Sequence, residues 1–236
     1  MDFSIILEDY QLYLDGFVTT AELVVLALVL GLVLAVPLAL LRTSRNPAVW
    51  VPVWAYIYFF RGTPLLVQLF MIYYGAGQFD FVRESMLWPF LREAYFCALL
   101  AFTLNTSAYT AEFLRGAIEA TPHGEVEAGR AAGMSPLLLF RRIVLPSAFR
   151  RALPAYGNEV IFMLHGSAIA SVITIVDITG AARIINSRYL SPYEAFLTAA
   201  ALYMVLTFCI VWLFKRFEHR WHAHLRPRAE SLGPAP

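Results

Sequence analysis

Five long apolar segments follow one another along the chain, separated by shorter stretches that hold most of its charged residues. A helix needs about 20 mostly apolar residues to cross a bilayer. The segments that approach or exceed this length are residues 17–41, 64–81, 94–114, 153–176 and 195–214. The second segment is shorter than the others, and the third is polar along one side. The pattern predicts an all-α membrane protein with five transmembrane helices.

Aromatic residues are concentrated just before the second of these segments, in residues 47–60. Trp and Tyr prefer the headgroup level of a bilayer, and this stretch contains Trp50, Trp54, Tyr56 and Tyr58. We expect an interfacial helix that runs into the second span, or a continuous, kinked helix. Thr63 can cap the start of that span, and Pro64 suits its first turn.

Basic residues are distributed very unequally between the two sets of connections. One set, with the C-terminal tail, holds 14 of the 18 lysines and arginines, and such loops face the cytoplasm. This asymmetry predicts an outside N-terminus, five crossings and an inside C-terminus. The largest internal loop is then residues 115–152. We expect one transmembrane domain over residues 1–222, followed by a disordered cytoplasmic tail over residues 223–236.

Composition agrees with a membrane protein. Apolar residues make up 59% of the chain and charged residues 15%, and the mean hydropathy is +0.62; ordinary globular chains carry about 25% charged residues. A water-soluble, disordered or disulfide-based protein is therefore excluded. A net charge of +1 also excludes a nucleic-acid binder recruited by bulk charge. Cys97 and Cys209 lie in apolar runs and are expected to be free, buried hydrophobes.

Enzymatic motifs are missing from the sequence. Its one lysine, Lys215, does not lie in the G-x-x-x-x-G-K-[ST] motif that holds nucleotide phosphates. His219, His222 and His224 could bind a metal weakly, but they have no plausible further ligand. We therefore expect no catalytic residue, no metal site and no cofactor. Energy for any active transport must come from an ion gradient or from a partner protein.

The internal loop has the local signals of two short helices joined by a bend. Thr121 can cap the first helix, Pro122 can start it, and Gly133 suits a left-handed position at its end. Small residues are frequent here: Ala128, Gly129, Ala131, Ala132 and Gly133. Such a surface lets another backbone come close, either within this chain or in a partner.

The second short helix is expected over residues 137–144. Ser135 can cap it and Pro136 can begin it. We expect it to stop before Pro146, because proline lacks the backbone N–H that a helix interior requires.

The spacing of this loop resembles the EAA loop of ABC-importer permeases, E-A-A-x3-G-x9-I-x-L-P. The matching residues are Glu127, Ala128, Gly129, Gly133, Ile143, Leu145 and Pro146. One residue departs from the pattern, since Gly129 stands where the family has alanine. The resemblance implies that these seven residues form a coupling helix that docks in a cleft of a cytoplasmic ATPase.

Three further stretches resemble the polar amino-acid permeases within that family. They are F-R-G-T-P-L-L-V-Q at residues 60–68, L-N-T-S-A-Y at residues 104–109, and A-Y-G-N-E-V-I-F-M-L-H at residues 155–165. Many members carry lysine where this chain has His165. A histidine there resembles the histidine, octopine and nopaline type, which implies basic amino acids or related opines as substrates.

Polar residues inside the predicted spans are candidates for a translocation pathway, because ionisable groups at membrane depth usually face a cavity or a partner. Helical periodicity places them on shared faces of the third and fourth spans. The candidates are Asn105, Tyr109, Glu112, Glu159 and Met163. Alternatively, the two glutamates form ion pairs with Arg115 or Arg61.

The remaining polar positions have structural interpretations first. Arg61, Gly62, Thr63 and Pro64 are expected to anchor a helix at the inner interface. His165 is expected to form a packing hydrogen bond, with a substrate contact as the alternative.

Taken together, the resemblance implies the permease subunit of an ATP-driven ABC importer of the type I fold, in a bacterial inner membrane. It would carry basic or related polar amino acids, and a separate ATPase would hydrolyse the ATP. The implied partners are two ATPase subunits, a second permease subunit, and a periplasmic or extracellular binding protein. Which amino acid or opine is carried, and whether the second permease is a copy or a homologue, stay open. The alternative function is a gradient-driven transporter that uses Glu112 or Glu159 as a proton carrier.

Overall fold

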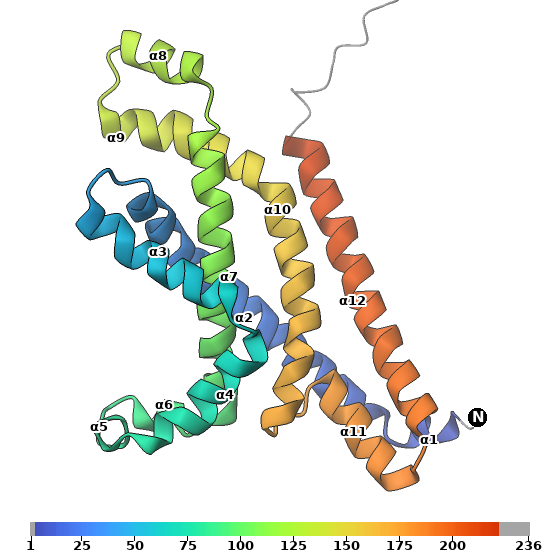
Figure 1. Cartoon of the computed structure of the whole chain (residues 1–236). Coiled ribbons are helices and arrows are strands. Elements are labelled where there is room, and N and C mark those ends of the chain that lie inside the picture. The colour runs from blue at the N-terminus through green and yellow to red at the C-terminus, as the bar shows by residue number, and fades with distance from the viewer. Residues whose placement is uncertain (1–2, 222–236) are drawn as a thin grey trace, which may run out of the picture.

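The computed structural model describes residues 3–221, and every regular element in that range is helical. The predicted all-α class is confirmed. Three long helices, α7 (Ala94–Glu119), α10 (Leu145–Gly166) and α12 (Pro192–Trp221), stand side by side. The longest helix, α2 (Tyr10–Arg42), crosses behind them at an angle and packs along α7 (Figure 1). The predicted tail, residues 223–236, lies outside the described residues.

Shorter helices connect and flank these four. They are α1 (Ser4–Glu8), α3 (Pro47–Gly62), α4 (Leu65–Gly75), α5 (Asp80–Arg83), α6 (Trp88–Leu91), α8 (His123–Ala131), α9 (Pro136–Leu139) and α11 (Ile178–Tyr189). Two turns are 3₁₀-helical, η1 (Ala76–Gln78) and η3 (Ser167–Ile173), and η2 (Phe140–Val144) is π-helical.

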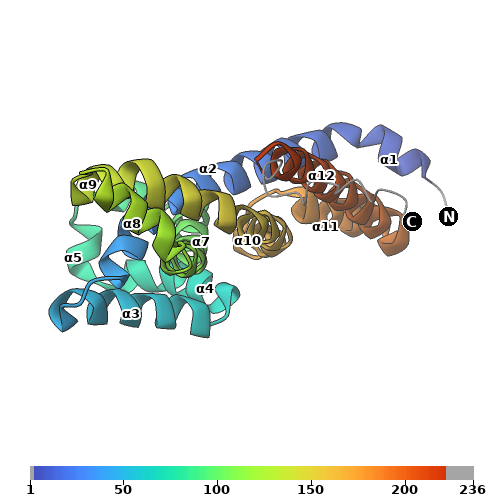
Figure 2. The same cartoon turned by 90° about the horizontal axis from the view of Figure 1, so that it is seen from above.

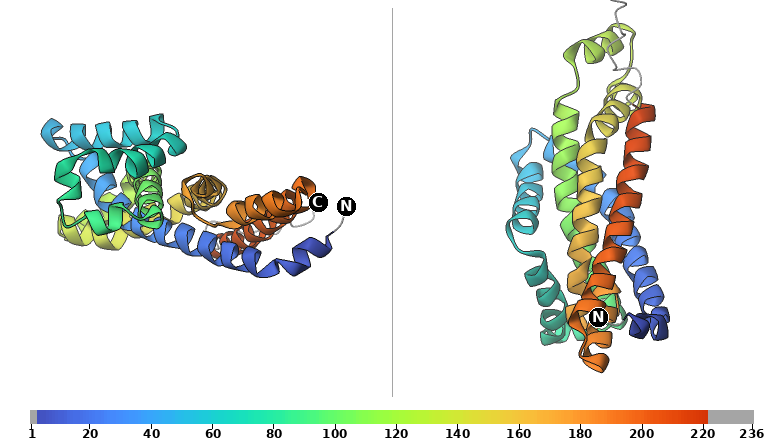
Figure 3. Two further views of the ribbon diagram at one scale, coloured as in Figure 1. Left: turned by 90° about the horizontal axis from the view of Figure 1, so that it is seen from below. Right: turned by 90° about the vertical axis from the view of Figure 1, so that its right-hand side faces the viewer.

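The two ends of the molecule are built differently. At one end lie α8, α9 and the last described turns of α12, in green and red (Figure 1). At the other end lie α4, α5, α6, α11 and the N-terminus, as the side view also shows (Figure 3). Seen from above, α3 and α4 flank α7 on one side, while α11 and α12 lie beyond α10 on the other (Figure 2). The N-terminus and the α8–α9 segment are therefore at opposite ends.

Length and hydropathy pick out fewer spans than the five expected. Among the described residues, α2 and residues 192–220 of α12 each pass such a test alone. Two bent pairs pass it together, α3 with residues 65–78 and residues 136–173 with α11. The helices therefore give two candidate spans, or four if each bent pair is one span. The third predicted span corresponds to α7, which is 26 residues long but polar along one side.

The second predicted span, residues 64–81, is not one helix. Helix α4 has 11 residues and ends at Gly75, so it is about 16 Å long, roughly half the hydrocarbon thickness of a bilayer. Gly75 and Gly77 lower the helix propensity at this point, and the chain continues through the short turns η1, α5 and α6. Helix α3 and residues 65–78, which contain α4 and η1, form a pair bent by 104°.

The bend between α3 and α4 also corrects the predicted cap. Thr63 closes the end of α3 instead of capping α4: its backbone N–H and its hydroxyl both donate to the carbonyl of Phe59, at 3.1 and 2.8 Å. Pro64 is extended and immediately precedes α4. Proline disfavours the helical conformation of the residue before it, which is why α3 cannot run on into α4.

The prediction that a helix stops before Pro146 is wrong. The chain stays helical from Pro136 to Ile173, through η2 and α10. A proline ring clashes with the carbonyl one turn earlier in a regular α-helix. Here the wider π-turn of η2 directly precedes Pro146 and gives the ring room. The fourth predicted span therefore begins earlier than residue 153, as α10.

Apolar side chains form the core where α2, α4, α7, α10 and η3 meet. Leu23, Leu69, Phe102, Met163 and Ile173 are buried there. Cys97 is buried and free as predicted, whereas Cys209 is free but exposed on α12. Large apolar side chains are also exposed along α2 and α12, and an exposed apolar surface of this extent indicates contact with lipid or with another subunit.

Candidate functional site

Helices α8 and α9 form a hairpin that projects from one end of the helix bundle; we call residues 121–146 the α8–α9 hairpin. Gly133 follows α8 in the left-handed conformation, with φ of +75°. The N–H groups of Gly133 and Met134 donate to the carbonyls of Arg130 and Gly129, at 2.9 and 3.1 Å. This is the glycine C-cap geometry that the sequence predicts. Ser135 also caps α9 as expected, by accepting from the N–H of Leu138.

Gly129, the one departure from the EAA pattern, is buried inside the hairpin. A Cβ atom at this position would lie 2.5 Å from Leu139 Cδ1 and 2.8 Å from Ile143 Cδ1. The two halves of the motif therefore pack against each other: glycine on α8 makes room for the branched residues of α9 and η2. Gly129 is an internal packing residue of the hairpin and not part of its outer surface.

The outer surface of the hairpin carries the other predicted residues of α8. Glu127, Ala128 and Gly133 are exposed, while Ile143, Leu145 and Pro146 are half-buried. Leu137 and Leu138, which the motif does not include, are exposed by 68% and 40%. Exposed leucines on a projecting element indicate a contact surface.

Polar contacts hold the base of the hairpin against the bundle. Arg151 of α10 donates to the carbonyl of Ala117 at 3.4 Å and to the hydroxyl of Thr121 at 3.5 Å. The hydroxyl of Ser147 donates to Glu125 at 3.3 Å. These bonds join the hairpin to α7 and α10, two of the long helices.

A cavity of about 460 Å³ lies between α3, α4, α7 and α10; we call it the central cavity. It is lined by Arg61, Leu65, Asn105, Tyr109, Phe113, Glu159, Phe162 and Met163. Four of the five predicted pathway residues meet here, from two different helices. Glu159 is only 5% exposed, and no carboxylate–arginine pair involves it among the described residues.

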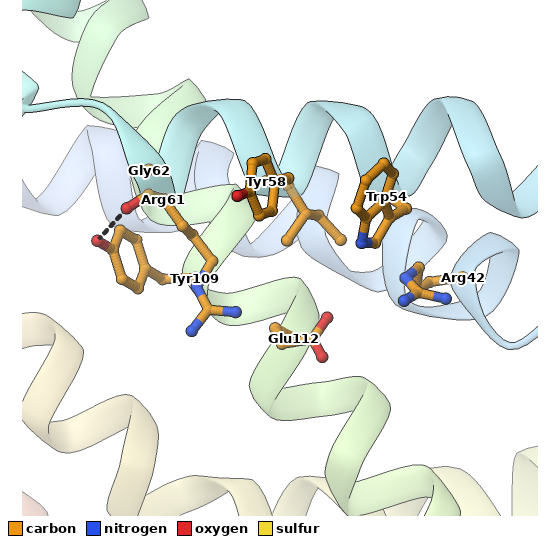
Figure 4. Close-up of a pocket in the computed structure, with 8 residues that line it drawn as sticks. Arg42, Trp54, Tyr58, Arg61, Gly62, Tyr109 and Glu112 are labelled. Atoms are coloured by element: carbon orange, nitrogen blue, oxygen red, sulfur yellow. Dashed lines mark hydrogen bonds between the residues drawn. The ribbon is translucent and has the colours of Figure 1, made fainter.

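Glu112, the fifth predicted pathway residue, lies elsewhere. It lines a neighbouring cavity of about 370 Å³, which we call the arginine cavity (Figure 4). Arg115 Nε donates to Glu112 at 2.9 Å, and Arg115 Nη1 donates to Glu119 at 2.6 Å. The geometry at Glu112 thus matches the predicted alternative of an ion pair with Arg115.

Arg61 and Tyr109 line both cavities. The hydroxyl of Tyr109 donates to the carbonyl of Arg61 at 3.3 Å, and the guanidinium of Arg61 lies 5.3 Å from the centre of the Tyr109 ring (Figure 4). Such stacking stabilises a cation over an aromatic face. Gly62 lines the arginine cavity, and Thr63 and Pro64 form the bend beside it.

Gln68 is the residue whose role the sequence reasoning missed. Its side-chain amide donates to the carbonyl of Phe60 at 2.8 Å and to the carbonyl and hydroxyl of Thr63, at 3.0 and 2.7 Å. Its oxygen accepts from Asn105 at 3.0 Å. Gln68 therefore fastens the bend after α3 to α7. The sequence signal for this role was the one glutamine in the otherwise apolar residues of α4.

Two further predictions concern single histidines and metals. His165 is exposed, and its Nε2 lies 3.1 Å from the hydroxyl of Thr207 on α12, which fits the expected packing hydrogen bond. Within residues 3–221 no cluster of three His, Cys, Asp or Glu side chains could hold a metal ion. His222 and His224 lie outside the described residues.

A bundle of apolar helices, a central cavity lined by both polar and apolar side chains, and a projecting helical hairpin form the architecture expected of a membrane permease. Residues 22–223 match the family described as the inner membrane component of binding-protein-dependent transport systems. The chain belongs to this family.

Curated relatives match over nearly the full chain. The nopaline transport system permease protein NocM of Agrobacterium fabrum is 46% identical over 99% of this chain and 98% of its own length. The octopine permease OccM of Rhizobium radiobacter is 50% identical over 87% of this chain and 84% of its own. The histidine/lysine/arginine/ornithine permease HisM of Escherichia coli K12 is 46% identical over 90% of each chain.

Solved structures share the fold. A chain in the crystal structure of an amino acid ABC transporter with histidines superposes with a TM-score of 0.83 at 36% identity, over 93% of this chain and 99% of that one. A chain of the MetNI methionine ABC transporter gives a TM-score of 0.75 at 20% identity, over 89% and 96%. The second likeness shows the fold alone.

This protein is therefore the inner-membrane permease component of an ABC importer. It works with a binding protein, and a separate ATPase subunit hydrolyses the ATP. Membership in this ATP-driven class decides against the gradient-driven transporter that the sequence left open.

Proposed function

We propose that this permease carries basic amino acids or related opines through the central cavity. The observation that carries the proposal is that a buried carboxylate, Glu159, and a guanidinium, Arg61, line the same cavity without forming an ion pair with each other. A basic amino acid has a carboxylate that Arg61 can bind and a cationic side chain that Glu159 can neutralise. Relatives whose names include histidine, lysine, arginine, octopine and nopaline support the same class of substrate.

The other lining residues suit such a substrate. Asn105 and Tyr109 provide polar groups on α7, while Met163, Phe162 and Phe113 provide apolar contact for the aliphatic part of the side chain. Buried charged and polar groups of this kind fix the orientation of a ligand in a mostly apolar cavity.

Substituting Glu159 tests this assignment. In vesicles reconstituted with the ATPase and the binding protein, Glu159→Gln should lower ATP-dependent uptake of basic amino acids at least tenfold, because a charge-assisted contact is lost. Uptake of a neutral analogue such as glutamine should fall much less. Glu84→Gln, which changes an exposed glutamate at the far end of the molecule, serves as the control. An equal loss for charged and neutral substrates would contradict the role given to Glu159.

For the topology, we propose five crossings with the N-terminus outside and the C-terminus inside, all within a single transmembrane domain over residues 1–222. The distribution of arginines supports this orientation, as does the location of the N-terminus and the α8–α9 hairpin at opposite ends (Figure 1). On this view α7 is a span despite its polar side, because that side faces the central cavity.

Cysteine labelling checks the orientation. In a Cys97→Ser, Cys209→Ser background, cysteine at Arg83 should react with a membrane-impermeant maleimide in intact cells. Cysteine at Glu125, in the α8–α9 hairpin, should react only after the membrane is permeabilised. Both positions are exposed in the structure, so burial cannot account for a difference, and the reverse pattern would overturn the topology.

For the assembly, we propose that a second permease subunit, a copy or a homologue, completes the pathway and that two ATPases dock on the two α8–α9 hairpins. Glu127, Ala128, Leu137 and Leu138 offer an exposed docking surface. Gly129, Gly133, Ile143, Leu145 and Pro146 hold its shape. ATP-driven closure of the ATPases would draw the hairpins together and tip the bundle between inward-open and outward-open states.

A further inference from the structure

The arginine cavity lies apart from the central cavity, between α3, α7 and the C-terminal end of α2 (Figure 4). Its volume is about 370 Å³. It is lined by Arg42, Trp54, Ile57, Tyr58, Arg61, Gly62, Tyr109 and Glu112. The cavity thus combines two guanidinium groups, three aromatic rings and one carboxylate.

The positive charge in this cavity is only partly balanced by the protein, because Glu112, which attracts both Arg42 and Arg61, is the one carboxylate among the lining residues. Its carboxylate, Glu112, is already bound by Arg115. Within residues 3–221 neither Arg42 nor Arg61 forms an ion pair. Arg42 lies with its guanidinium 5.2 Å from the centre of the Trp50 ring, and its Nε is buried without a hydrogen-bond partner. A buried donor left unpaired is costly, so an anion bound here would satisfy it.

One side of the cavity lies at the end of a candidate membrane span. Arg42 is the last residue of α2, a helix long and apolar enough to cross a bilayer, and the chain turns back after it through residues 43–46. The following helix, α3, presents Trp54 and Tyr58, which stack with ring centres 5.3 Å apart and are exposed by 42% and 68%. Exposed Trp and Tyr beside the end of a span are typical of the membrane–water interface.

We infer that the arginine cavity binds the phosphate group of an anionic phospholipid, held by Arg42 and Arg61, with the glycerol and acyl region against Trp54 and Tyr58. Guanidinium groups bind phosphate oxygens through paired N–H donors. Basic pockets between transmembrane helices at an interface are known to bind lipid headgroups.

A free phosphate ion offers the same chemistry as the headgroup, and an amino-acid carboxylate offers a related one. The lipid is favoured because the aromatic rings of Trp54 and Tyr58 are exposed on α3, a helix that lies at the edge of the molecule (Figure 2). A free phosphate ion has no apolar part that could contact these rings.

The test uses the purified complex of the permease with its ATPase, in detergent. Native mass spectrometry should detect retained phosphatidylglycerol, and added phosphatidylglycerol should raise the unfolding midpoint more than phosphatidylcholine does. Arg42→Gln should lower the apparent affinity for phosphatidylglycerol about tenfold, because a charge-assisted contact is removed. Arg45→Gln, which removes an equal charge three residues further on at an exposed site, should leave the affinity unchanged.

Two competitor arms identify the ligand. Neither millimolar inorganic phosphate nor arginine should displace phosphatidylglycerol; displacement by phosphate would assign the site to a free anion, and displacement by arginine would assign it to substrate. Equal affinities in wild type and Arg42→Gln would overturn the proposal. If Arg42→Gln does not assemble, Arg42→Lys keeps the charge but loses the paired donors, so its affinity should fall severalfold, and an unchanged value would overturn the proposal as well.

Discussion

Replacing Gly133 with valine should abolish substrate uptake while the subunit still inserts into the membrane. Gly133 has a φ of +75°, a conformation that a β-branched residue adopts only at a cost of about 1–3 kcal/mol. The strain falls on the turn between α8 and α9 and does not reach the spans. We therefore expect a displaced docking surface, measurable as weakened co-purification of the ATPase and as loss of uptake in reconstituted vesicles.

Asparagine at the same position supplies the matched control. It tolerates the left-handed conformation far better than valine does, and no atom lies within 4 Å of a Cβ built at Gly133. Gly133→Asn should therefore retain most of the uptake although it adds a side chain of similar size. Equal losses in the two variants would mean that side-chain bulk on the surface, and not backbone conformation, is what matters there.

The α8–α9 hairpin shows which features a sequence can predict. The positions of Gly133 and Ser135 follow from local rules, since a glycine that ends a helix and a serine that starts the next need only their neighbours. The burial of Gly129 could not be predicted in this way, because it depends on contact with Leu139 and Ile143. Spacing alone placed Gly129 in the docking set without distinguishing inner from outer residues.

The residues of the central cavity also show which features a sequence can predict and which it cannot. Helical periodicity placed Asn105 and Tyr109 on one face of α7, and Glu159 and Met163 on one face of α10, and those two faces meet. Glu112 lies on the same predicted face of α7, but a neighbouring arginine three residues further on binds it. Periodicity gives the direction of a side chain, whereas the partner that binds it depends on rotamers and on other helices.

The bends in the chain were only partly predictable. The break between α3 and α4 follows from a local rule, because Pro64 disfavours a helical Thr63, but the hydrogen bonds from Gln68 that fasten the bend depend on residues of other segments. The continuous helix through Pro146 contradicts a rule that holds for regular helices. There the π-turn of η2 makes room for the proline ring, which no local pattern displays.

Replacing Gln68 with leucine should have the second large effect, a loss of both stability and uptake. Leucine fills a similar volume but cannot donate to the carbonyls of Phe60 and Thr63 or accept from Asn105. Each buried polar group left without a partner costs roughly 1–3 kcal/mol. The bend would loosen, and Arg61, which lies between Phe60 and Thr63, would leave its position between the two cavities. We expect a lower unfolding midpoint and a fall in uptake of at least tenfold.

Two further variants separate this role from a general effect of lost polarity. Gln78→Leu removes an exposed glutamine whose amide reaches only the carbonyl of Tyr74, at 3.5 Å, so it should behave like the wild type. Gln68→Glu keeps the shape and the acceptor for Asn105 but loses the donors to Phe60 and Thr63. If the donors fasten the bend, uptake by this near-isosteric variant should fall nearly as far as uptake by Gln68→Leu. Wild-type uptake by Gln68→Glu would show that the contact with Asn105 alone holds α4 against α7, and that the bend after α3 is stable without Gln68.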